Sequence, residues 1–409
     1  MSQSTCPVSG ENRRKTNYPG EKLEPAVEVV DGVWHVRDMA AAREVLRSRN
    51  TTQAGFNVET INMGWLRPPI LFSDGEPHRT QRAAIARYFA PKTVARNYHE
   101  LMEGYAEQLV DEFRASGSVD LSQLSLRYSV VVAAQVVGLT NSDYEKMARR
   151  LERFFDTPVA PTQATRPATA TLRSRFETLR VSTAGQLPML SFHLHDVRPA
   201  IKARRKQPQS DVISHLIEAG YSELEIMIEC ITYGAAGMVT TREFIGMATW
   251  QMLEHDELRA RYLAGDKADR HLVLHEILRL DPIVGHLLRR TTAPIDVVVD
   301  GEQVTIPAGS LVDLYIRGTN ADPKVVGEAP LDLCPGRELP PRVGAEVMSF
   351  GDGAHKCPGN SLAIQEADVL LQRLLRLPIR LATRPTIAWD ELIKGYEVRN
   401  IRLVLDRDA

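Results

Sequence analysis

A single cysteine near the C-terminal end stands in a setting that favours metal chemistry. Cys357 lies in the ten residues FGDGAHKCPG, from Phe350 to Gly359, and an amphipathic run from Ser361 to Leu377 follows it. This pattern predicts a tight, glycine-rich loop leading into a helix N-terminus, where backbone N–H groups and the helix dipole favour an anion. We therefore expect Cys357 to be a thiolate. A thiolate in a loop whose glycines admit a flat ligand is what an axial ligand of haem iron requires.

An isolated cysteine in a turn is most often buried and inert, and that alternative would hold for Cys357 by itself. The whole pattern F-G-x-G-x-H-x-C-x-G is far more specific, and it resembles the cysteine loop of the cytochrome P-450 family of haem-thiolate monooxygenases. The resemblance implies a mainly α fold with small β-sheets, in which a long central helix lies over the haem and the Cys loop beneath it. It implies that Phe350, Gly351, His355, Cys357 and Gly359 bind haem b (iron protoporphyrin IX), with Cys357 as the metal ligand.

The longest predicted helix, from Ser222 to His255, must lie opposite this loop. Ser222 and Glu225 form a capping box at its start, and its centre reads YGAAGMVTT. Mid-helix glycines cost about 1 kcal/mol each relative to alanine. We therefore expect something large to approach the helix backbone there. The alternative is that these small residues serve only to let neighbouring helices pack closely.

This centre resembles the oxygen-activating stretch A-G-x-acid-T-T of the same family, with one departure. Ala236, Gly237, Thr240 and Thr241 match, and Val239 stands at the position of the acid. The resemblance implies that Ala236, Gly237 and Thr240 are catalytic, with Thr240 steering protons to bound dioxygen. The role of the acid does not carry over. Proton supply would come through water or substrate, or the chemistry would be peroxide-driven oxidation or radical coupling.

Basic side chains elsewhere suit the carboxylates of a haem. The string DGEPHRTQR opens a helix at Asp74, and its His78 and Arg82 share one face. Such a pair suits a buried anion such as a haem propionate, although a solvated basic face is the simpler alternative. The resemblance favours the first reading and adds Arg289, with Arg290 as the alternative, as a second propionate ligand.

A further pair is expected to be structural. Glu276 and Arg279 are three residues apart on a helix that ends at Asp281, and such pairs usually lie at the surface. The resemblance implies instead a buried pair that supports folding and haem retention. Arg337 is the nearest candidate to complete it, although the usual spacing of the family is not kept.

The rest of the chain is expected to be helical, with two groups of short strands. The prediction comprises a hairpin at 27–37, helices near 38–48, 97–114 and 122–139, a capping box at Ser142 and Glu145, strands at 295–304 and 310–315, a hairpin at 394–405, and irregular segments at 50–73 and 157–171. Pocket-lining residues are expected at 57–63, Met238, Val239, 283–287 and Val398.

Bulk properties restrict the class of protein. The chain has 409 residues and a net charge of −2, so nucleic-acid binding is not expected. Its four cysteines are scattered, which suggests neither a zinc site nor a disulfide framework. Residues 1–25 are expected to form a flexible arm and residues 26–409 a single domain. Without an apolar run of about 20 residues, we expect no membrane anchor, a cytoplasmic location and a soluble, bacterial-type family member.

The function implied by the resemblance is insertion of one oxygen atom of O₂ into a C–H bond of a small, mainly apolar molecule. The chain has no flavin or iron–sulfur motif, so a ferredoxin and an NAD(P)H-dependent ferredoxin reductase are the expected electron donors. Lys356, Arg79 and Arg373 are candidates for docking such a partner, and the protein is expected to be a monomer. A non-enzymatic haem-based sensor and a haem-free protein are the remaining alternatives.

Overall fold

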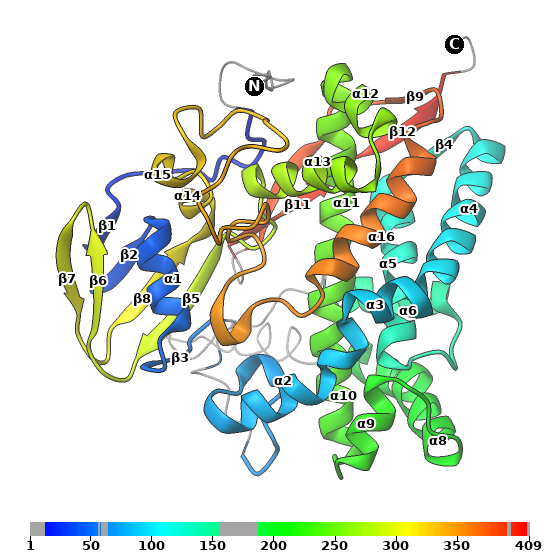
Figure 1. Cartoon of the computed structure of the whole chain (residues 1–409). Coiled ribbons are helices and arrows are strands. Elements are labelled where there is room, and N and C mark those ends of the chain that lie inside the picture. Colours follow the sequence, from blue (N-terminus) through cyan, green and yellow to red (C-terminus); the bar gives the residue numbers. More distant parts are fainter. Residues whose placement is uncertain (1–12, 56–57, 59–63, 156–186, 391–393, 407–409) are drawn as a thin grey trace, which may run out of the picture.

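The computed structural model describes residues 13–55, 58, 64–155, 187–390 and 394–406. These residues form a mainly α-helical protein with small β-sheets gathered at two places (Figure 1), which confirms the predicted fold class. The helices are α1 (Met39–Arg47), α2 (Gly75–Phe89), α3 (Pro91–Thr93), α4 (His99–Ser116), α5 (Leu121–Val137), α6 (Tyr144–Phe155), α8 (Arg198–Lys206), α9 (Val212–Glu218), α10 (Glu223–Gly234), α11 (Thr240–Glu254), α12 (Asp256–Ala264), α13 (Lys267–Leu280), α14 (Ile316–Thr319), α15 (Pro323–Val326) and α16 (Asn360–Leu374).

The strands form a five-stranded sheet and three smaller units. The large sheet has the order β1 (Val27–Val30), β2 (Val33–Val36), β8 (Leu311–Tyr315), β5 (His286–Thr291) and β3 (Thr51–Gln53), with only the β2–β8 pair parallel. The smaller units are the hairpin β6 (Ile295–Val299)–β7 (Glu302–Ile306), the hairpin β10 (Thr386–Asp390)–β11 (Gly395–Arg399), and the sheet β4 (Ser118–Asp120)–β12 (Arg402–Leu405)–β9 (Ile379–Leu381).

Local signals explain many element boundaries. The predicted hairpin at 27–37 is confirmed, with Asp31 and Gly32 both at positive φ in its turn. Asp38 caps α1 by accepting the N–H of Ala41 at 2.8 Å. Gly138 ends α5 in the left-handed conformation. These caps fix where helices begin and end without help from distant parts of the chain.

The central helix is confirmed over its whole predicted length. α10, a π-helical segment at Ala235–Val239 and α11 follow one another without a break. The capping box of Ser222 and Glu225 is present at its start. The π-helical segment coincides with the glycine- and alanine-rich centre, and π-bulges of this kind are frequent at functional sites.

Three local predictions are wrong. Ser142 does not cap α6, because Asp143 accepts the N–H of Lys146 at 3.1 Å, whereas the Ser142 hydroxyl has no partner among the described residues. Residues 394–405 do not form a hairpin: β11 pairs with the preceding β10, and β12 joins β4 and β9. The segment 50–73 contains β3 and a 3₁₀ turn at Ile70–Phe72. The predicted loop at 157–171 and the pocket residues 59–63 lie outside the described residues.

The N-terminal segment is also not a loose arm where the structure describes it. Thr16 is fully buried, and its N–H and hydroxyl both donate to Asp281 Oδ1, at 2.9 and 2.8 Å. Arg14 is buried and donates to the backbone oxygens of Leu280 and Arg317 at 3.1 and 2.7 Å. Residues 13–16 are therefore part of the folded core. Cys334 takes part in a disulfide bond, which its isolated place in the sequence did not predict.

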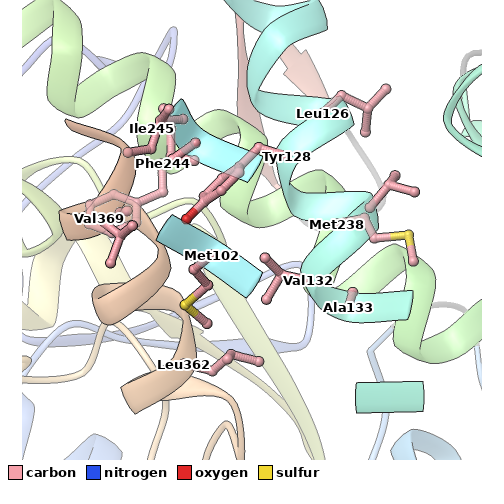
Figure 2. Close-up of a cluster of buried hydrophobic side chains, with 14 of the residues drawn as sticks. Met102, Leu126, Tyr128, Val132, Ala133, Met238, Phe244, Ile245, Leu362 and Val369 are labelled. Atoms are coloured by element: carbon pink, nitrogen blue, oxygen red, sulfur yellow. The ribbon is translucent and has the colours of Figure 1, made fainter. Parts of the chain in front are cut away.

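The main hydrophobic core lies between the helices (Figure 2), and a second, smaller core lies between α1, the five-stranded sheet and the β6–β7 hairpin. α5 is buried on almost every side and contacts α4, α6, α10 and α11, so it runs through the larger core. Met238, predicted to line a pocket, is fully buried in this core instead. Among the described residues, no helix combines the length and the apolar character needed to span a membrane.

Candidate active site

The loop that carries Cys357 depends on two glycines. Gly351 and Gly353 have φ of +69° and +67°, a region that glycine adopts without steric cost. A Cβ on Gly353 would overlap the carbonyl oxygen of Leu46, at the end of α1. The N–H of Cys357 donates to the backbone oxygen of Phe350 at 2.9 Å and closes the loop. The tight loop predicted from the sequence is therefore confirmed.

An acidic residue between the two glycines fastens the loop to α1. Asp352 Oδ1 accepts the N–H of Gly353 at 2.7 Å. Its Oδ2 lies 2.9 Å from Arg43 Nε and 3.0 Å from Arg47 Nη2. The role of Asp352 could not be predicted from its local sequence, because both arginines lie some 300 residues earlier in the chain.

The environment of the Cys357 thiol has opposing effects on its charge. Burial raises the pKa of the thiol, whereas the N–H of Gly359 and the charges of Arg82 and Lys356 lower it. The net direction is upward, because burial outweighs the hydrogen bond and the two neighbouring charges. A coordinated metal ion deprotonates a thiol outright. Cys357 as a residue is only partly buried.

Four basic side chains gather beside this loop. His78 and His355 stack with ring centroids 4.0 Å apart. Arg82 donates to the backbone oxygen of Lys356, one residue before the cysteine. Arg289, on β5, is close enough to depress the pKa of both histidines. The structure thus brings together the side chains that the sequence analysis assigned to propionates.

One carboxylate accompanies this basic cluster. Asp74 Oδ1 lies 3.1 Å from His355 Nε2, and its Oδ2 accepts the N–H of Gln53 at 2.9 Å. Burial alone would raise the pKa of Asp74, but these hydrogen bonds hold it below its usual value. Burial also lowers the pKa of His78 to about 4 and that of Arg289 to about 10. Asp74 was predicted only as the start of a helix, and no local signal links it to a histidine 281 residues away.

The two candidate arginines on β5 point to different surroundings. Arg289 is 3% exposed and donates to Gln53 Oε1 at 2.5 Å. Arg290 donates to the backbone oxygen of Gly309 at 3.1 Å, in an exposed position. The strand alternates its side chains between two faces, and Arg289 is the one on the face of the basic cluster.

The centre of the long helix presents a gap in its own surface. Ala236 is exposed although it lies midway along a helix that runs through the core. Thr240 Oγ1 donates to the backbone oxygen of Ala236 at 2.6 Å. Gly237 faces the other way, where an added Cβ would lie 3.8 Å from Ala133 Cβ on α5. Ala236 and Thr240 therefore share the open side of the helix, and Gly237 allows close packing on the other side.

The nearest acid to Thr240 along the helix is not available to it. Glu243 is 2% exposed, and its two oxygens accept from Arg242 Nε and from the N–H of Val398, both at 2.6 Å. Burial raises the pKa of Glu243. Val239, at the position of the family's acid, has no ionisable group.

Glu276 and Arg279 form a buried ion pair on α13. Arg279 Nε and Nη2 each lie 2.8 Å from a carboxylate oxygen of Glu276, and both residues are at most 5% exposed. Arg337 Nη2 lies 3.4 Å from Glu276 Oε1, and the N–H of Cys334 donates to the same oxygen at 2.8 Å. Arg337 therefore does join this pair despite its unusual spacing.

The three predicted docking residues are each paired with acids. Lys356 Nζ lies 2.8 Å from Glu346, and Arg79 contacts Glu76. Arg373 lies 3.2 Å from both Glu103 and Glu107. Two surface clefts, of about 530 and 510 Å³, lie at the N-terminal segment and between α4, α13 and α16. Neither is lined by Cys357 or by the basic cluster.

Comparisons with known proteins agree with this site. The family model described as Cytochrome P450 matches residues 271–377, which include Glu276, Arg279 and Cys357. The chain is 26% identical to Cytochrome P450 130 of Mycobacterium tuberculosis, over 81% of this chain and 78% of that protein. It is 25% identical to Erythromycin C-12 hydroxylase of Saccharopolyspora erythraea, over 84% of this chain and 81% of that protein. The chain belongs to the cytochrome P450 family.

Solved structures agree on the fold. A mutant of P450 EryK in complex with erythromycin B superposes with a TM-score of 0.72 at 23% identity, covering 94% of each chain. The predicted cytochrome P-450 fold is therefore confirmed. The protein is an oxidoreductase of the monooxygenase type, and its cofactor is haem b, as in other P450 proteins.

The residues present fit this cofactor. Haem b requires one axial ligand and compensation of two propionate charges. A single thiol stands next to two arginines, Arg82 and Arg289, which carry positive charge, and two histidines, His78 and His355, which can donate hydrogen bonds; one carboxylate, Asp74, accompanies them. On the central helix, Ala236 leaves the surface open. The thiol, the basic side chains and the open helix surface are thus of the kinds that haem b requires.

Proposed function

We propose that this P450 hydroxylates C–H bonds of a small, mainly apolar molecule with O₂ and two electrons from an external donor. In this proposal the Cys357 thiolate holds the haem iron, and His78, Arg82, Arg289 and His355 hold the propionates. The observation that carries it is the meeting of one thiol with a basic cluster from α2, β5 and the Cys loop. A surface cation patch would leave its members solvated, whereas His78 and Arg289 are almost fully buried.

Each part of the chain has a separate task in this reaction. Bound haem supplies the oxidising chemistry, and the protein supplies orientation and exclusion of water. Thr240 is proposed to hold a proton at Oγ1, which its hydrogen bond to Ala236 keeps in a fixed direction. Ala236 is proposed to leave room for the haem at the open side of the helix, whereas Gly237 faces α5. Phe350, Gly351 and Gly359 are proposed to shape the loop around the sulfur, and Glu276 with Arg279 to secure the fold beneath it.

The donor and the substrate belong to the same proposal. A ferredoxin with its NAD(P)H-dependent reductase is the proposed electron source, because P450 enzymes act with redox partners. The relatives differ widely in the compounds that their names record, from erythromycin to biotin biosynthesis. This range supports a small organic substrate without selecting one. We also propose that the protein acts as a monomer in the cytoplasm.

The test is the absorption spectrum of the reduced protein with and without carbon monoxide. We expect a strongly red-shifted Soret band in the wild type and its loss in Cys357→Ala. The matched control is Cys230→Ala, because Cys230 is the other free cysteine in the described chain and is buried in the helical core. A haem band that Cys357→Ala leaves unchanged would reject Cys357 as the ligand.

A second candidate reaction uses peroxide in place of O₂ and electrons. Val239 removes the usual acid, and Glu243 is held by Arg242 and by Val398. Delivery of protons to dioxygen is needed only when the enzyme reduces O₂ itself, so a site without an acid is better suited to peroxide. Product formation with hydrogen peroxide alone, compared with ferredoxin, reductase and NAD(P)H, separates the two reactions.

A further inference from the structure

Among the described residues, Arg317 is the largest fully buried side chain that lies outside the candidate active site. It lies in α14, directly after β8, and is fully buried. Burial of a guanidinium is costly unless hydrogen bonds and an opposite charge compensate for it. The partners of Arg317 therefore indicate which parts of the protein it holds together.

These partners come from segments far apart in the sequence. Nε lies 3.2 Å from Glu21 Oε2 in the N-terminal segment, and Nη1 donates to the backbone oxygen of Lys394 at 3.1 Å. The guanidinium carbon lies 5.3 Å from the ring centre of Trp389, on β10, and 5.4 Å from that of Tyr315, on β8. Arg317 thus joins the N-terminal segment and the large sheet to β10 and to Lys394, the residue directly before β11.

A glycine makes room for this arrangement. A Cβ on Gly285 would overlap both Arg317 Nη1 and the carbonyl oxygen of Lys394. Gly285 accepts the N–H of Ile316 at 2.8 Å and lies two residues before Leu287. An added Cβ on Gly351 of the Cys357 loop would lie 3.4 Å from Leu287 Cδ1. The contact of Arg317 with Lys394 therefore lies beside Gly285, and Leu287, two residues further along the chain, lies beside the Cys357 loop.

The other end of β11 is fixed to the central helix. The N–H of Val398 donates to Glu243 Oε2 at 2.6 Å, and its carbonyl oxygen accepts from Ser122 Oγ at 3.2 Å. An added Cβ on Gly246 would lie 3.6 Å from Val398 Cβ. Glu243 follows Thr240 by less than one helical turn. Strand β11 therefore runs from Glu243 and Gly246 on the central helix to a point beside β5, and Figure 1 shows it between α11 and the large sheet.

We propose that Arg317 is a positioning residue that sets the width of the substrate pocket by holding β11 in place. It acts through Lys394 and Trp389. Since Val398 is fixed independently by Glu243, loss of Arg317 would release the Lys394 end of the strand. The inference rests on the proposed haem-thiolate function, because it assigns β11 to the wall of that site.

Two azole ligands of different size test the proposal in the ferric holoenzyme. Imidazole needs only access to the iron, whereas 4-phenylimidazole also fills the space next to it. For Arg317→Met, which keeps length but removes charge and hydrogen bonds, we expect the Kd of 4-phenylimidazole to change by about tenfold, the equivalent of one lost hydrogen bond to a charged group. The Kd of imidazole should stay within about twofold. Arg290→Met is the matched control, since Arg290 is only partly buried and lies on the neighbouring strand β5.

The outcomes separate this inference from the proposed function. Equal changes for both azoles, or no change for either, would overturn the role of Arg317. A wild-type protein that binds no haem would instead overturn the proposed function.

A milder variant covers the case in which Arg317→Met does not fold. Glu21→Gln weakens the carboxylate partner that Arg317 shares with Arg14 and the N–H of Tyr18, and we expect faster hydrogen exchange in residues 395–399 with unchanged exchange in residues 350–359. Unchanged exchange in both stretches would contradict the proposal, because β11 would then not depend on this contact.

Discussion

The Cys357 loop and the central helix both carry residues of the candidate site, but they are built in different ways. The loop is fixed by its own backbone: glycines at positive φ, a closing hydrogen bond between residues 350 and 357, and an acid that caps it. The helix instead offers an open stretch, with exposed Ala236 next to a π-helical segment. The wall next to it, β11, is held by side chains from distant segments.

This difference separates what the chemistry requires from what the substrate requires. A metal ligand must be placed to within a fraction of an ångström, and a short glycine loop achieves this with few residues. A substrate pocket must differ between enzymes of one family, and side-chain contacts such as Arg317 with Lys394 can change one at a time. We therefore expect substitutions in the loop to affect stability and haem binding, and substitutions opposite it to affect selectivity and coupling.

The largest effect is expected for Gly353→Ala in the loop. The substitution forces an L-residue into positive φ and places a Cβ on the carbonyl oxygen of Leu46, a backbone atom that cannot rotate away. We expect the free energy of unfolding to fall by about 3–5 kcal/mol, with loss of haem. Denaturant unfolding and the haem content of the purified protein measure both effects.

Gly309→Ala is the control for this prediction. Gly309 also has positive φ, +79°, but no atom lies within 4 Å of an added Cβ. Its substitution should lower the free energy of unfolding by only about 1–2 kcal/mol. If the two variants were equally stable, the contact with Leu46 would not matter and the loop would be less rigid than the comparison requires.

The loop was also the part that the sequence predicted best. Its motif, the capping box at Ser222 and the pair Glu276–Arg279 all depend on residues within about one helical turn or one tight turn of each other. Local stereochemistry therefore carries enough information to place them. The basic cluster needed the resemblance in addition, because His78 and Arg289 lie 211 positions apart.

The failures share the opposite property. The pairing of β11 with β10 rather than β12, the burial of Thr16 and the place of Asp74 all depend on partners far along the chain. A stretch of alternating residues predicts a strand but not its neighbour. The thiol of Cys357 shows the same limit in electrostatics: the helix N-terminus could be read from the sequence, but the burial that raises the pKa could not.

A second prediction concerns the helix that follows the loop. Glu366, on α16, is 2% exposed, and its Oε1 has no hydrogen-bond partner among the described residues. Burial raises its pKa from 4.5 to about 8, and the nearby Ser129 hydroxyl offsets this only in part. Between pH 4.5 and 8 the folded protein holds a proton that the unfolded chain has released. The contribution of Glu366 to the free energy of unfolding is therefore fully present below pH 4.5 and is lost as the pH rises towards 8.

Glu366→Gln should remove this dependence. The wild type is expected to lose up to about 1.4 kcal/mol of unfolding free energy per pH unit in that window through this group, and the amide variant should lack this contribution. Urea unfolding at several pH values measures the difference. Glu107→Gln, an exposed site on α4, should keep the wild-type slope. Equal slopes for Glu366→Gln and the wild type would mean that the cysteine side of the site tolerates a buried charge.

The smallest effect is expected opposite the loop, at Val239. Val239→Asp restores an ionisable group one residue before Thr240 with little change in side-chain volume, at a position that is only partly buried. With ferredoxin, reductase and NAD(P)H, and a compound chosen because it shifts the haem spin state, product formed per NAD(P)H should rise about threefold, because general acid catalysis assists proton delivery. Peroxide-driven turnover should not change.

Val239→Asn has the same shape without the titratable proton, so an equal gain there would assign the effect to polarity. A gain restricted to the aspartate would show that proton supply is adjusted on the helix side without any change in the Cys357 loop.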